Sequence, residues 1–322
     1  MEDVYKKIWD RVRASKHVLL ISHKKPDGDT LGAMLAFAGA LEAKGVAHTR
    51  FCADEVPSPY FFMPGSHLVT SDHDAVLDAR PDIVISFDAG DLVFAGAHGL
   101  VSRIYPKPFI INIDHHHTNT RFGDINAVVT DAASTTEVVH RLMATNNISV
   151  DMKMATCVLT GLCTDTGNFS NPATTSSSLL LGANLLAQGA KFGSVYRALW
   201  KNKSLEGLKL WGAALERLRY NPENQTATTA LFLKDLADSD SDEEAAEGIS
   251  NFLSSVLNVS VVLVLREAEN GKVKGSYRTT GDIDVSALAA AYGGGGHKKA
   301  AGFLAAGGIE ELANEWRVAV NN

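Results

Sequence analysis

Three short apolar runs in the first half of the chain alternate with helical patterns, and this alternation constrains the fold more than any other feature. The runs are HVLLI at 17–21, DIVISF at 82–87 and FIINI at 109–113. Each has the length and the β-branched or aromatic content of a buried strand. Apolar residues at helical spacing fill 30–45, and 134–145 predicts a further helix. We therefore expect an α/β fold, with a mostly parallel sheet covered by helices on both faces.

The second half predicts a smaller α/β domain. Its helical stretch is interrupted by the turn sequence NPEN at 221–224, which marks a change of pattern. Beyond it lie strand and helix patterns. In order, the elements expected in this half are helices over 176–219, a strand at 226–234, a helix at AAEGISNFLSSVL (245–257), strands at 259–267 and 272–278, and a last helix near IEELANEWRVAV (309–320).

Size and charge narrow the classes of protein. A chain of 322 residues suggests two domains, and 45% hydrophobic with 21% charged residues is typical of a folded globular protein. The formal net charge of −7 argues against a long grip on duplex nucleic acid, although a short anionic ligand can still bind in one pocket. The longest apolar run, VSVVLVL, is far below the roughly 20 residues of a membrane span. No secretory signal precedes the first strand, and the three cysteines have neither metal nor redox spacing, so a cytoplasmic location is expected.

Residue types that bind metals follow each apolar run directly. Because ligands bind at the carboxyl ends of parallel strands, these side chains are expected at one rim of the sheet. Several carboxylates gathered in one place repel one another unless cations neutralise them, so the pattern predicts a metal site. The residues are His23, Asp27 and Asp29 after the first run, Asp88 and Asp91 after the second, and Asp114, His115, His116 and His117 after the third.

Each of these residues taken alone has an ordinary alternative. Asp29 could cap a helix that begins at Thr30, and Asp88 could be a loop residue. Their convergence favours the metal site. Oxygen and nitrogen donors without thiolate favour Mn²⁺ or Mg²⁺, and imidazole adds Fe, Zn or Co. The donors exceed the needs of one ion, and a two-metal site with a shared aspartate suits hydrolysis of a phosphate ester.

Two further motifs carry polar or flexible residues. GLCTDTGNFS at 161–170 contributes Asp165, either as a ligand or as a residue of a polar turn that ends a helix. GGGGHKKAAGF at 293–303 contains four consecutive glycines, and backbone N–H groups in such a loop can hold phosphate oxygens. A glycine run by itself is also typical of a flexible turn.

Five motifs of this chain, taken in their order along the sequence, resemble the motifs of the DHH/DHHA1 phosphoesterases. They are SHKKPDGDTLG, SFDAGD, NIDHHHTN, GLCTDTGNF and GGGGHKKAAGF. The size resembles the nanoRNase and pAp-phosphatase branch, a compact relative of the RecJ exonucleases. The resemblance spans about residues 17–303 and implies a division into three parts. These are a DHH catalytic domain at 1–190, a helical linker at 191–220 and a DHHA1 substrate-binding domain at 221–322.

The resemblance also implies residue roles. His23 and Asp27 would bind one Mn²⁺, with Mg²⁺ or Co²⁺ as alternatives. Asp29, His115 and Asp165 would bind a second, and Asp88 would bridge the two and be catalytic. His116 would face the scissile phosphate, Asp114 would orient the neighbouring loop or a histidine, and His117 and Asp91 receive no ligand role. The residues implied to hold the substrate's terminal phosphate are Arg278, Gly295, Gly296 and His297. The family often has Gly-Ser where this chain has Gly32-Ala33, a change expected to be tolerated in helix packing.

The implied activity is hydrolysis of short oligoribonucleotides, from di- to pentanucleotides, or of 3′-phosphoadenosine 5′-phosphate (pAp), by metal-activated water. Cyclic or linear signalling dinucleotides (c-di-AMP, c-di-GMP, pApA, pGpG) are the alternative substrates. A family II pyrophosphatase shares the first-domain motifs but has a different second domain. A catalytically silent nucleotide-binding module is disfavoured because every implied ligand is present. The sequence leaves open whether the chain forms a homodimer.

Overall fold

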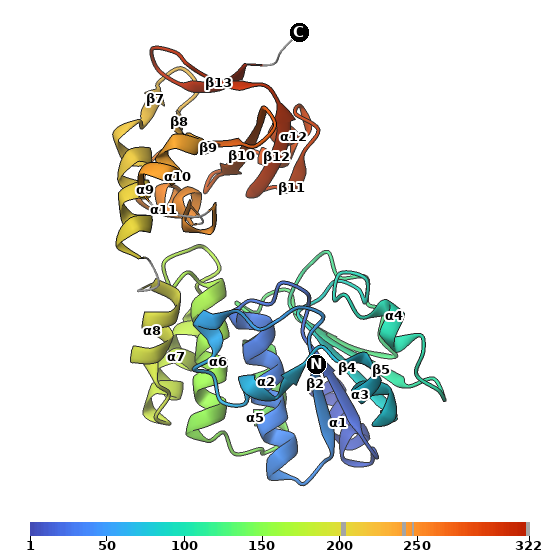
Figure 1. Ribbon diagram of the computed structural model, residues 1–322. Helices are drawn as coiled ribbons and strands as arrows, with labels where there is room; N and C mark the ends of the chain where they lie inside the picture. The colour runs from blue at the N-terminus through green and yellow to red at the C-terminus, as the bar shows by residue number, and fades with distance from the viewer. Residues whose placement is uncertain (201–203, 240–242, 247, 320–322) are drawn as a thin grey trace. The chain divides into compact units, whose positions relative to one another are not determined.

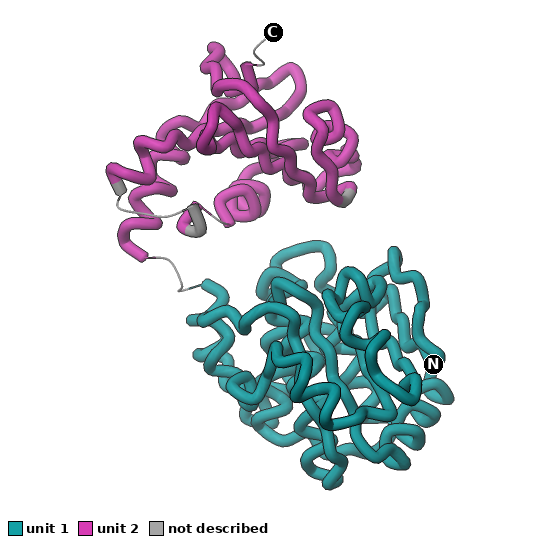
Figure 2. The backbone as a smooth tube through the Cα atoms, turned by 45° about the vertical axis from the view of Figure 1, so that its right-hand side comes forward, with its two compact units in different colours: residues 1–202 teal, residues 203–322 magenta. Residues whose placement is uncertain are grey.

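The computed structural model describes residues 1–200, 204–239, 243–246 and 248–319. The chain divides into two compact units, Met1–Asn202 and Lys203–Asn322, which Figure 2 distinguishes by colour. Among the described residues, no helix combines the length and the apolar character that crossing a bilayer requires.

The first unit is built on a six-stranded sheet in the order β3-β2-β1-β4-β5-β6, with every neighbouring pair parallel. The three predicted strands form its centre. The sequence analysis missed the other three, which are only two to four residues long and partly polar. The strands are β1 (Val18–Ile21), β2 (His48–Phe51), β3 (Val69–Thr70), β4 (Ile83–Phe87), β5 (Phe109–Asp114) and β6 (Ile125–Val128).

Helices cover both faces of this sheet, as predicted (Figure 1). Alternate residues of the central strands enter two separate cores: Leu20 and Ile85 belong to one, Leu19 and Val84 to the other. Burial on both faces explains why the strands are apolar without interruption. The first face carries α1 (Glu2–Arg13), α2 (Gly28–Ala43), α5 (Thr135–Thr145) and α6 (Met152–Asp165), and the second carries α3 (His73–Asp78) and α4 (His98–Val101).

Helix α2 differs from the amphipathic helix that the apolar spacing predicts. It begins at Gly28 rather than Thr30, and it is buried almost all round as far as Leu41. The reason is that the sheet covers one side while α5 and α6 cover others. Ala33 is fully buried, so the Gly-Ala pair at this point does serve packing, as expected.

Glycines allow α2 and α6 to approach closely. A Cβ added at Gly32 would lie 2.5 Å from the carbonyl oxygen of Cys157, and one at Gly161 would lie 2.4 Å from Oδ1 of Asp29. Neither side chain fits without displacement. The close crossing brings the first turn of α2, which carries Asp29, beside the last turns of α6, which ends at Asp165.

Replacing Gly161 with alanine should therefore destabilise the protein by about 1–3 kcal/mol, the usual range for overpacking, and should move Asp29. Gly212, inside α9 (Leu205–Glu216), is a matched control because a Cβ there meets nothing within 4 Å. Gly212→Ala should raise stability by about 0.5–1 kcal/mol. Denaturant unfolding of both variants measures the difference, and equal stability would show that the close crossing is unimportant.

The other helices of the 176–219 stretch are α7 (Ser176–Ala187) and α8 (Phe192–Trp200), which belong to the first unit, whereas α9 belongs to the second. The division of the chain into units falls between Asn202 and Lys203, within the range of the expected linker. The proposed division into 1–190, 191–220 and 221–322 stays a prediction.

The second unit has a mixed six-stranded sheet in the order β11-β12-β10-β9-β8-β7. Only β8 and β9 run parallel, and the other neighbours are antiparallel. Helices α10 (Leu233–Ser239), α11 (Ile249–Val256) and α12 (Val285–Ala290) accompany the strands β7 (Arg219–Asn221), β8 (Thr226–Leu231), β9 (Val261–Ala268), β10 (Lys272–Arg278), β11 (Gly295–His297) and β12 (Ala300–Ala306).

The prediction of a helix at 309–320 is wrong. The described residues of this segment form two antiparallel strands, β13 (Gly308–Glu311) and β14 (Trp316–Ala319). Trp316 and Val318 are buried while Arg317 between them is exposed. This period of two is the strand pattern, and burial of the tryptophan on it outweighs the helix propensity of Glu, Leu and Ala nearby.

Candidate metal centre

The predicted metal-binding residues gather at the carboxyl ends of the central strands. β1 and β4 are neighbours although two strands lie between them in the chain, so the strand order reverses direction here. Such a reversal leaves a crevice beyond the strand ends. His23 follows β1, Asp88 comes directly after β4, and Asp114 is the last residue of β5.

Asp88 lies at the middle of this rim and faces both sides of it. Its Oδ2 is 3.5 Å from Nε2 of His23, whereas its Oδ1 is 3.4 Å from Nδ1 of His116 and 3.8 Å from Nε2 of His115. Its backbone has φ of +56°, which is uncommon for a residue with a side chain and costs about 1–3 kcal/mol. The bond from its N–H to the carbonyl of Ile113, 3.0 Å long, helps to hold this conformation.

All the predicted ligands are brought together in small groups. In each group the candidate ligand atoms lie within 4.8 Å of one another. Asp88 is shared by two groups and His115 by two. The groups are His23, Asp27 and Asp88; Asp29, His115 and Asp165; and Asp88, His115 and His116. The first two correspond to the two predicted ion sites.

Hydrogen bonds orient two imidazoles so that one nitrogen of each stays free for a cation. Nδ1 of His23 lies 2.8 Å from the carbonyl of Lys24, and Nδ1 of His115 lies 3.1 Å from the carbonyl of Ala132. Since a carbonyl only accepts, both Nδ1 atoms donate, and Nε2 is the nitrogen of each ring that would bind a cation after losing its proton. Nε2 of His115 is buried and lies 3.1 Å from Oδ2 of Asp165. A buried imidazole nitrogen among carboxylates fits a divalent cation.

The start of α5 positions two of the carboxylates. Asp29 accepts from the backbone N–H groups of Thr135, at 2.6 Å, and Thr136, at 3.0 Å. The hydroxyl of Thr135 also donates to Oδ1 of Asp88 at 2.8 Å. The interpretation of Asp29 as the cap of its own helix is wrong, because Asp27 caps α2 by accepting from the N–H groups of Asp29 and Thr30. Asp29 instead meets the amino-terminal end of α5.

The sequence analysis did not identify Thr135. Its signal is the helix-start pattern Ser134-Thr-Thr-Glu137, in which Oγ of Ser134 accepts from the N–H of Glu137. Tyr60 was also missed. It packs against Gly28, whose added Cβ would lie 3.2 Å from its ring. Burial, together with the Asp27 carboxylate, raises the pKa of Tyr60 to about 12, so the phenol stays neutral.

The cluster without metal holds protons that a cation would displace. Burial and the Asp165 and Asp88 carboxylates raise the pKa of Asp29 well above its usual value. Burial likewise raises the pKa of Asp165 to about 6. Burial alone would lower the pKa of His115, but Asp165 and Asp29 raise it to about 9. Burial would raise the pKa of Asp88, yet His116 and His23 hold it low. Cation binding must therefore release protons.

Asp114 holds the NIDHHHTN loop in place. Its Oδ1 accepts from the backbone N–H of His115 at 2.7 Å and from Nδ1 of His116 at 2.8 Å, while Asn119 donates to its Oδ2. This is the orienting position expected for Asp114. The Asp114 and Asp88 carboxylates raise the pKa of His116 to about 11, and 46% of the His116 side chain is exposed. Nδ1 of His116 is thus occupied by Asp114, and Nε2 is the ring nitrogen that this contact leaves available.

The remaining two residues of these motifs lie outside the groups. His117 is exposed. Asp91 accepts from the N–H of Phe94 at 2.6 Å and shapes the turn after β4.

The predicted substrate residues of the second unit meet at one end of its sheet. Arg278 pairs with Ala300, which pairs in turn with His297. Nε of Arg278 donates to Asn251 at 2.6 Å. The side chain of His297 lies outside the described residues.

Part of the glycine run lies in a strand rather than in the loop or flexible turn that the sequence suggests. Gly295 and Gly296 belong to the edge strand β11, and a Cβ at Gly294 would lie 2.2 Å from the carbonyl of Gly302. At Gly296, φ is +146° and a Cβ would lie 2.6 Å from the carbonyl of Ala300. Close packing on β12 therefore requires glycine at these two positions, whereas Gly295 has open space around it.

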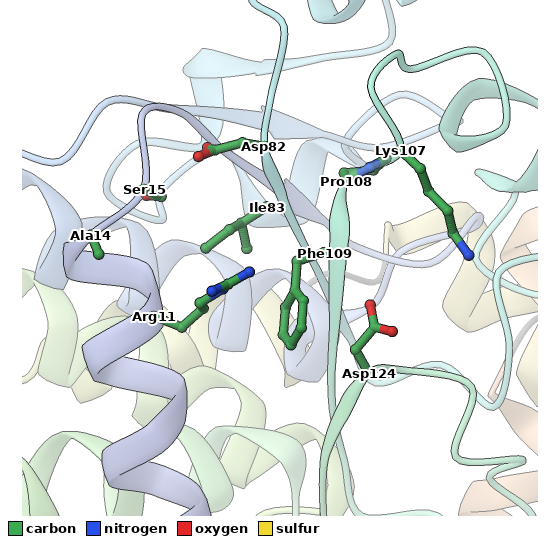
Figure 3. Close-up of a pocket in the computed structure, with 9 residues that line it drawn as sticks. All are labelled: Arg11, Ala14, Ser15, Asp82, Ile83, Lys107, Pro108, Phe109 and Asp124. Atoms are coloured by element: carbon green, nitrogen blue, oxygen red, sulfur yellow. The ribbon is translucent and has the colours of Figure 1, made fainter.

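A separate cavity of about 450 Å³ lies at the amino ends of β4 and β5, the edge of the sheet opposite to the metal cluster (Figure 3). The guanidinium of Arg11 stacks over the ring of Phe109 at 4.4 Å in this cavity. Asp82 and Asp124 line it, and both accept from backbone N–H groups. None of its lining residues belongs to the carboxylate–imidazole cluster.

The parallel α/β sheet carries a buried carboxylate–imidazole cluster that could bind metal ions at its carboxyl rim. Together with the family match and the relatives given next, this cluster indicates a hydrolase. The chain belongs to the DHH family. Residues 17–162 match the DHH family, N-terminal domain, and residues 225–318 match the DHHA1 domain.

Known relatives cover nearly the whole chain. The bifunctional oligoribonuclease and PAP phosphatase NrnA of Thermus thermophilus is 31% identical over 306 residues, which is 91% of this chain and 88% of the relative. A probable protein of the same name from Streptococcus mutans is 24% identical and covers 92% of both chains. The crystal structure of an exopolyphosphatase-related protein from Bacteroides fragilis has a TM-score of 0.85 at 24% identity, covering 94% of this chain and 91% of that one, and so shares the fold.

Proposed function

We propose that this protein is a Mn²⁺-dependent phosphoesterase that hydrolyses short oligoribonucleotides and pAp. The observation that carries the proposal is the position of Asp88, whose two carboxylate oxygens face separate groups of nitrogen and oxygen donors. A shared aspartate between two donor sets suits a pair of cations. The relatives named as oligoribonuclease and PAP phosphatase support the choice of substrate.

The ligands in this proposal are assigned to two ions. His23 and Asp27 would hold one Mn²⁺, Asp29, His115 and Asp165 would hold the other, and Asp88 would be the ligand that they share. When bound, the cations would supply a water activated near neutral pH and neutralise phosphate charge. The backbone N–H groups of Thr135 and Thr136 fix the direction of Asp29, and Asp114 fixes His116. Held in this way, protonated His116 donates to a phosphoryl oxygen and stabilises charge in the transition state.

A short substrate with phosphate at both ends suits the rest of the chain. Arg278 and the backbone of Gly295, Gly296 and His297 would bind a phosphate of the substrate, which is the role proposed for the DHHA1 domain. The net charge of −7 favours a short ligand in a local site over long nucleic acid. A cytoplasmic location and Mn²⁺ in preference to Mg²⁺ or Co²⁺ are part of this proposal.

A substrate panel tests the function. Hydrolysis of pAp, RNA of two to five nucleotides, pGpG and cyclic dinucleotides is measured with Mn²⁺ under the same conditions. We expect pAp and short RNA to have the highest kcat/KM. A preference for cyclic dinucleotides or pGpG would replace the proposed substrates with signalling dinucleotides, and binding of pAp without hydrolysis of any substrate would indicate a binding module.

A further inference from the structure

The ring of Phe94 stands at the rim of the metal cluster and is half exposed. Its centroid lies 5.5 Å from that of the His23 ring, at an interplanar angle of 51°. Phe94 nevertheless keeps 51% of its surface exposed. A large aromatic side chain therefore packs one part of its surface against a candidate metal ligand and presents another part to solvent.

A compact turn fixes this ring in its place. Oδ1 of Asp91 accepts from the N–H of Phe94 at 2.6 Å, and the carbonyl of Asp91 accepts from the N–H of Ala95 at 3.0 Å. Gly96 continues the turn with φ of +72°, and its added Cβ would lie 2.9 Å from Cβ of Ala53. Ala95 and Ala97 on either side of it are fully buried. The turn is thus anchored below the ring, and this anchoring is what the otherwise unassigned Asp91 does.

The proposed substrate supplies a group that matches the exposed ring. A nucleotide whose phosphate lies at the cluster carries its sugar and base outward from the rim, and a base has an apolar π face. Base stacking on aromatic side chains is strong and tolerates any sequence, because every base has such a face. The Phe94 ring can offer contact area but no hydrogen bonds, so it would accept each of the four bases.

We propose that Phe94 is the stacking surface for the nucleobase of the nucleotide whose phosphate is hydrolysed. The inference rests on the proposed function and deepens it: the site recognises a nucleoside through its base as well as a phosphate, without selecting one base. Asp91 is a positioning residue in this arrangement, since it acts through the backbone of Phe94.

The test compares pAp with ribose 3′,5′-bisphosphate, which has both phosphates and no base. Phe94→Leu keeps an apolar side chain against His23 but removes the π face. It should lower kcat/KM for pAp by roughly 5- to 150-fold, chiefly through KM, the range that loss of one stacked base covers. Hydrolysis of ribose bisphosphate and the Mn²⁺ content should be unchanged. Phe94→Trp should restore the preference for pAp.

Tyr105→Ala is the matched control, because Tyr105 is 90% exposed and precedes β5 at the opposite edge of the same sheet. This variant should hydrolyse pAp and ribose bisphosphate at the same kcat/KM as the unaltered protein. If the unaltered protein hydrolyses pAp and the Phe94→Leu variant keeps the full preference for pAp, the inference is overturned while the proposed function stands. Equal losses on both substrates would also overturn it, since the ring would then only support His23. An unaltered protein that hydrolyses neither compound would overturn the proposed function and the inference with it.

Discussion

Asp88→Asn is expected to reduce hydrolysis of pAp by at least about a hundredfold, since outer-shell substitutions alone cost metal sites about 10–100-fold. Asparagine tolerates the left-handed backbone that Asp88 adopts at φ of +56°, so the turn should survive. The amide of asparagine is neutral, so it cannot replace the negative charge that the Asp88 carboxylate brings to both donor sets. Metal content, measured on the purified variant by elemental analysis, should fall below that of the unaltered protein.

The control for this variant is Asp131→Asn. Asp131 is a carboxylate with 85% of its side chain exposed, 3.9 Å from Arg141 and outside the three groups of candidate ligands. It should keep full activity and metal content. Circular dichroism and the unfolding midpoint establish that both variants are folded. An active Asp88→Asn variant with its metal retained would contradict a bridging role for Asp88.

Alanine substitution of the three consecutive histidines should give three different results. His115→Ala should lose both metal and turnover, because Nε2 of His115 is a buried candidate ligand atom grouped with the carboxylates of Asp29 and Asp165. His116→Ala should lower kcat by about 10²–10³, the usual effect of removing one donor that stabilises transition-state charge, while metal content stays near normal. His117→Ala should change neither quantity, since its side chain is exposed.

Parallel measurements of metal content and kcat separate these outcomes. His117→Ala is the internal control, because it alters the same tripeptide. An inactive His117→Ala variant would mean that the register of the loop is misassigned. Metal loss in His116→Ala as large as in His115→Ala would mean that His116 is a ligand rather than a group that faces the phosphate.

Much of the candidate site could be predicted because its residues follow strands. A run such as HVLLI predicts both a strand and the edge at which it ends, so the sequence alone places His23 and Asp88 at one rim. Contacts between distant segments could not. The N–H of Thr135 binds Asp29 across 106 residues of chain, and no local pattern joins the two. The packing role of Phe94 beside His23 is hidden for the same reason.

The errors in the fold have physical causes as well. Strands β2, β3 and β6 are so short that their pairing in the sheet, rather than their own sequence, makes them strands. The segment at 308–319 contains good helix formers, but the buried Trp316 and Val318 alternate with exposed neighbours and decide for a hairpin. The last two glycines of the run, Gly295 and Gly296, lie in the edge strand β11, where the backbone packs tightly on β12.

Titration of Mn²⁺ into metal-free protein, with the rate of pAp hydrolysis as the readout, tests the two-cation phosphoesterase most directly. The account predicts that hydrolysis stays low through the first equivalent and reaches its maximum when two equivalents are bound per chain. Maximal hydrolysis with one equivalent, or hydrolysis that is independent of added metal, would contradict it.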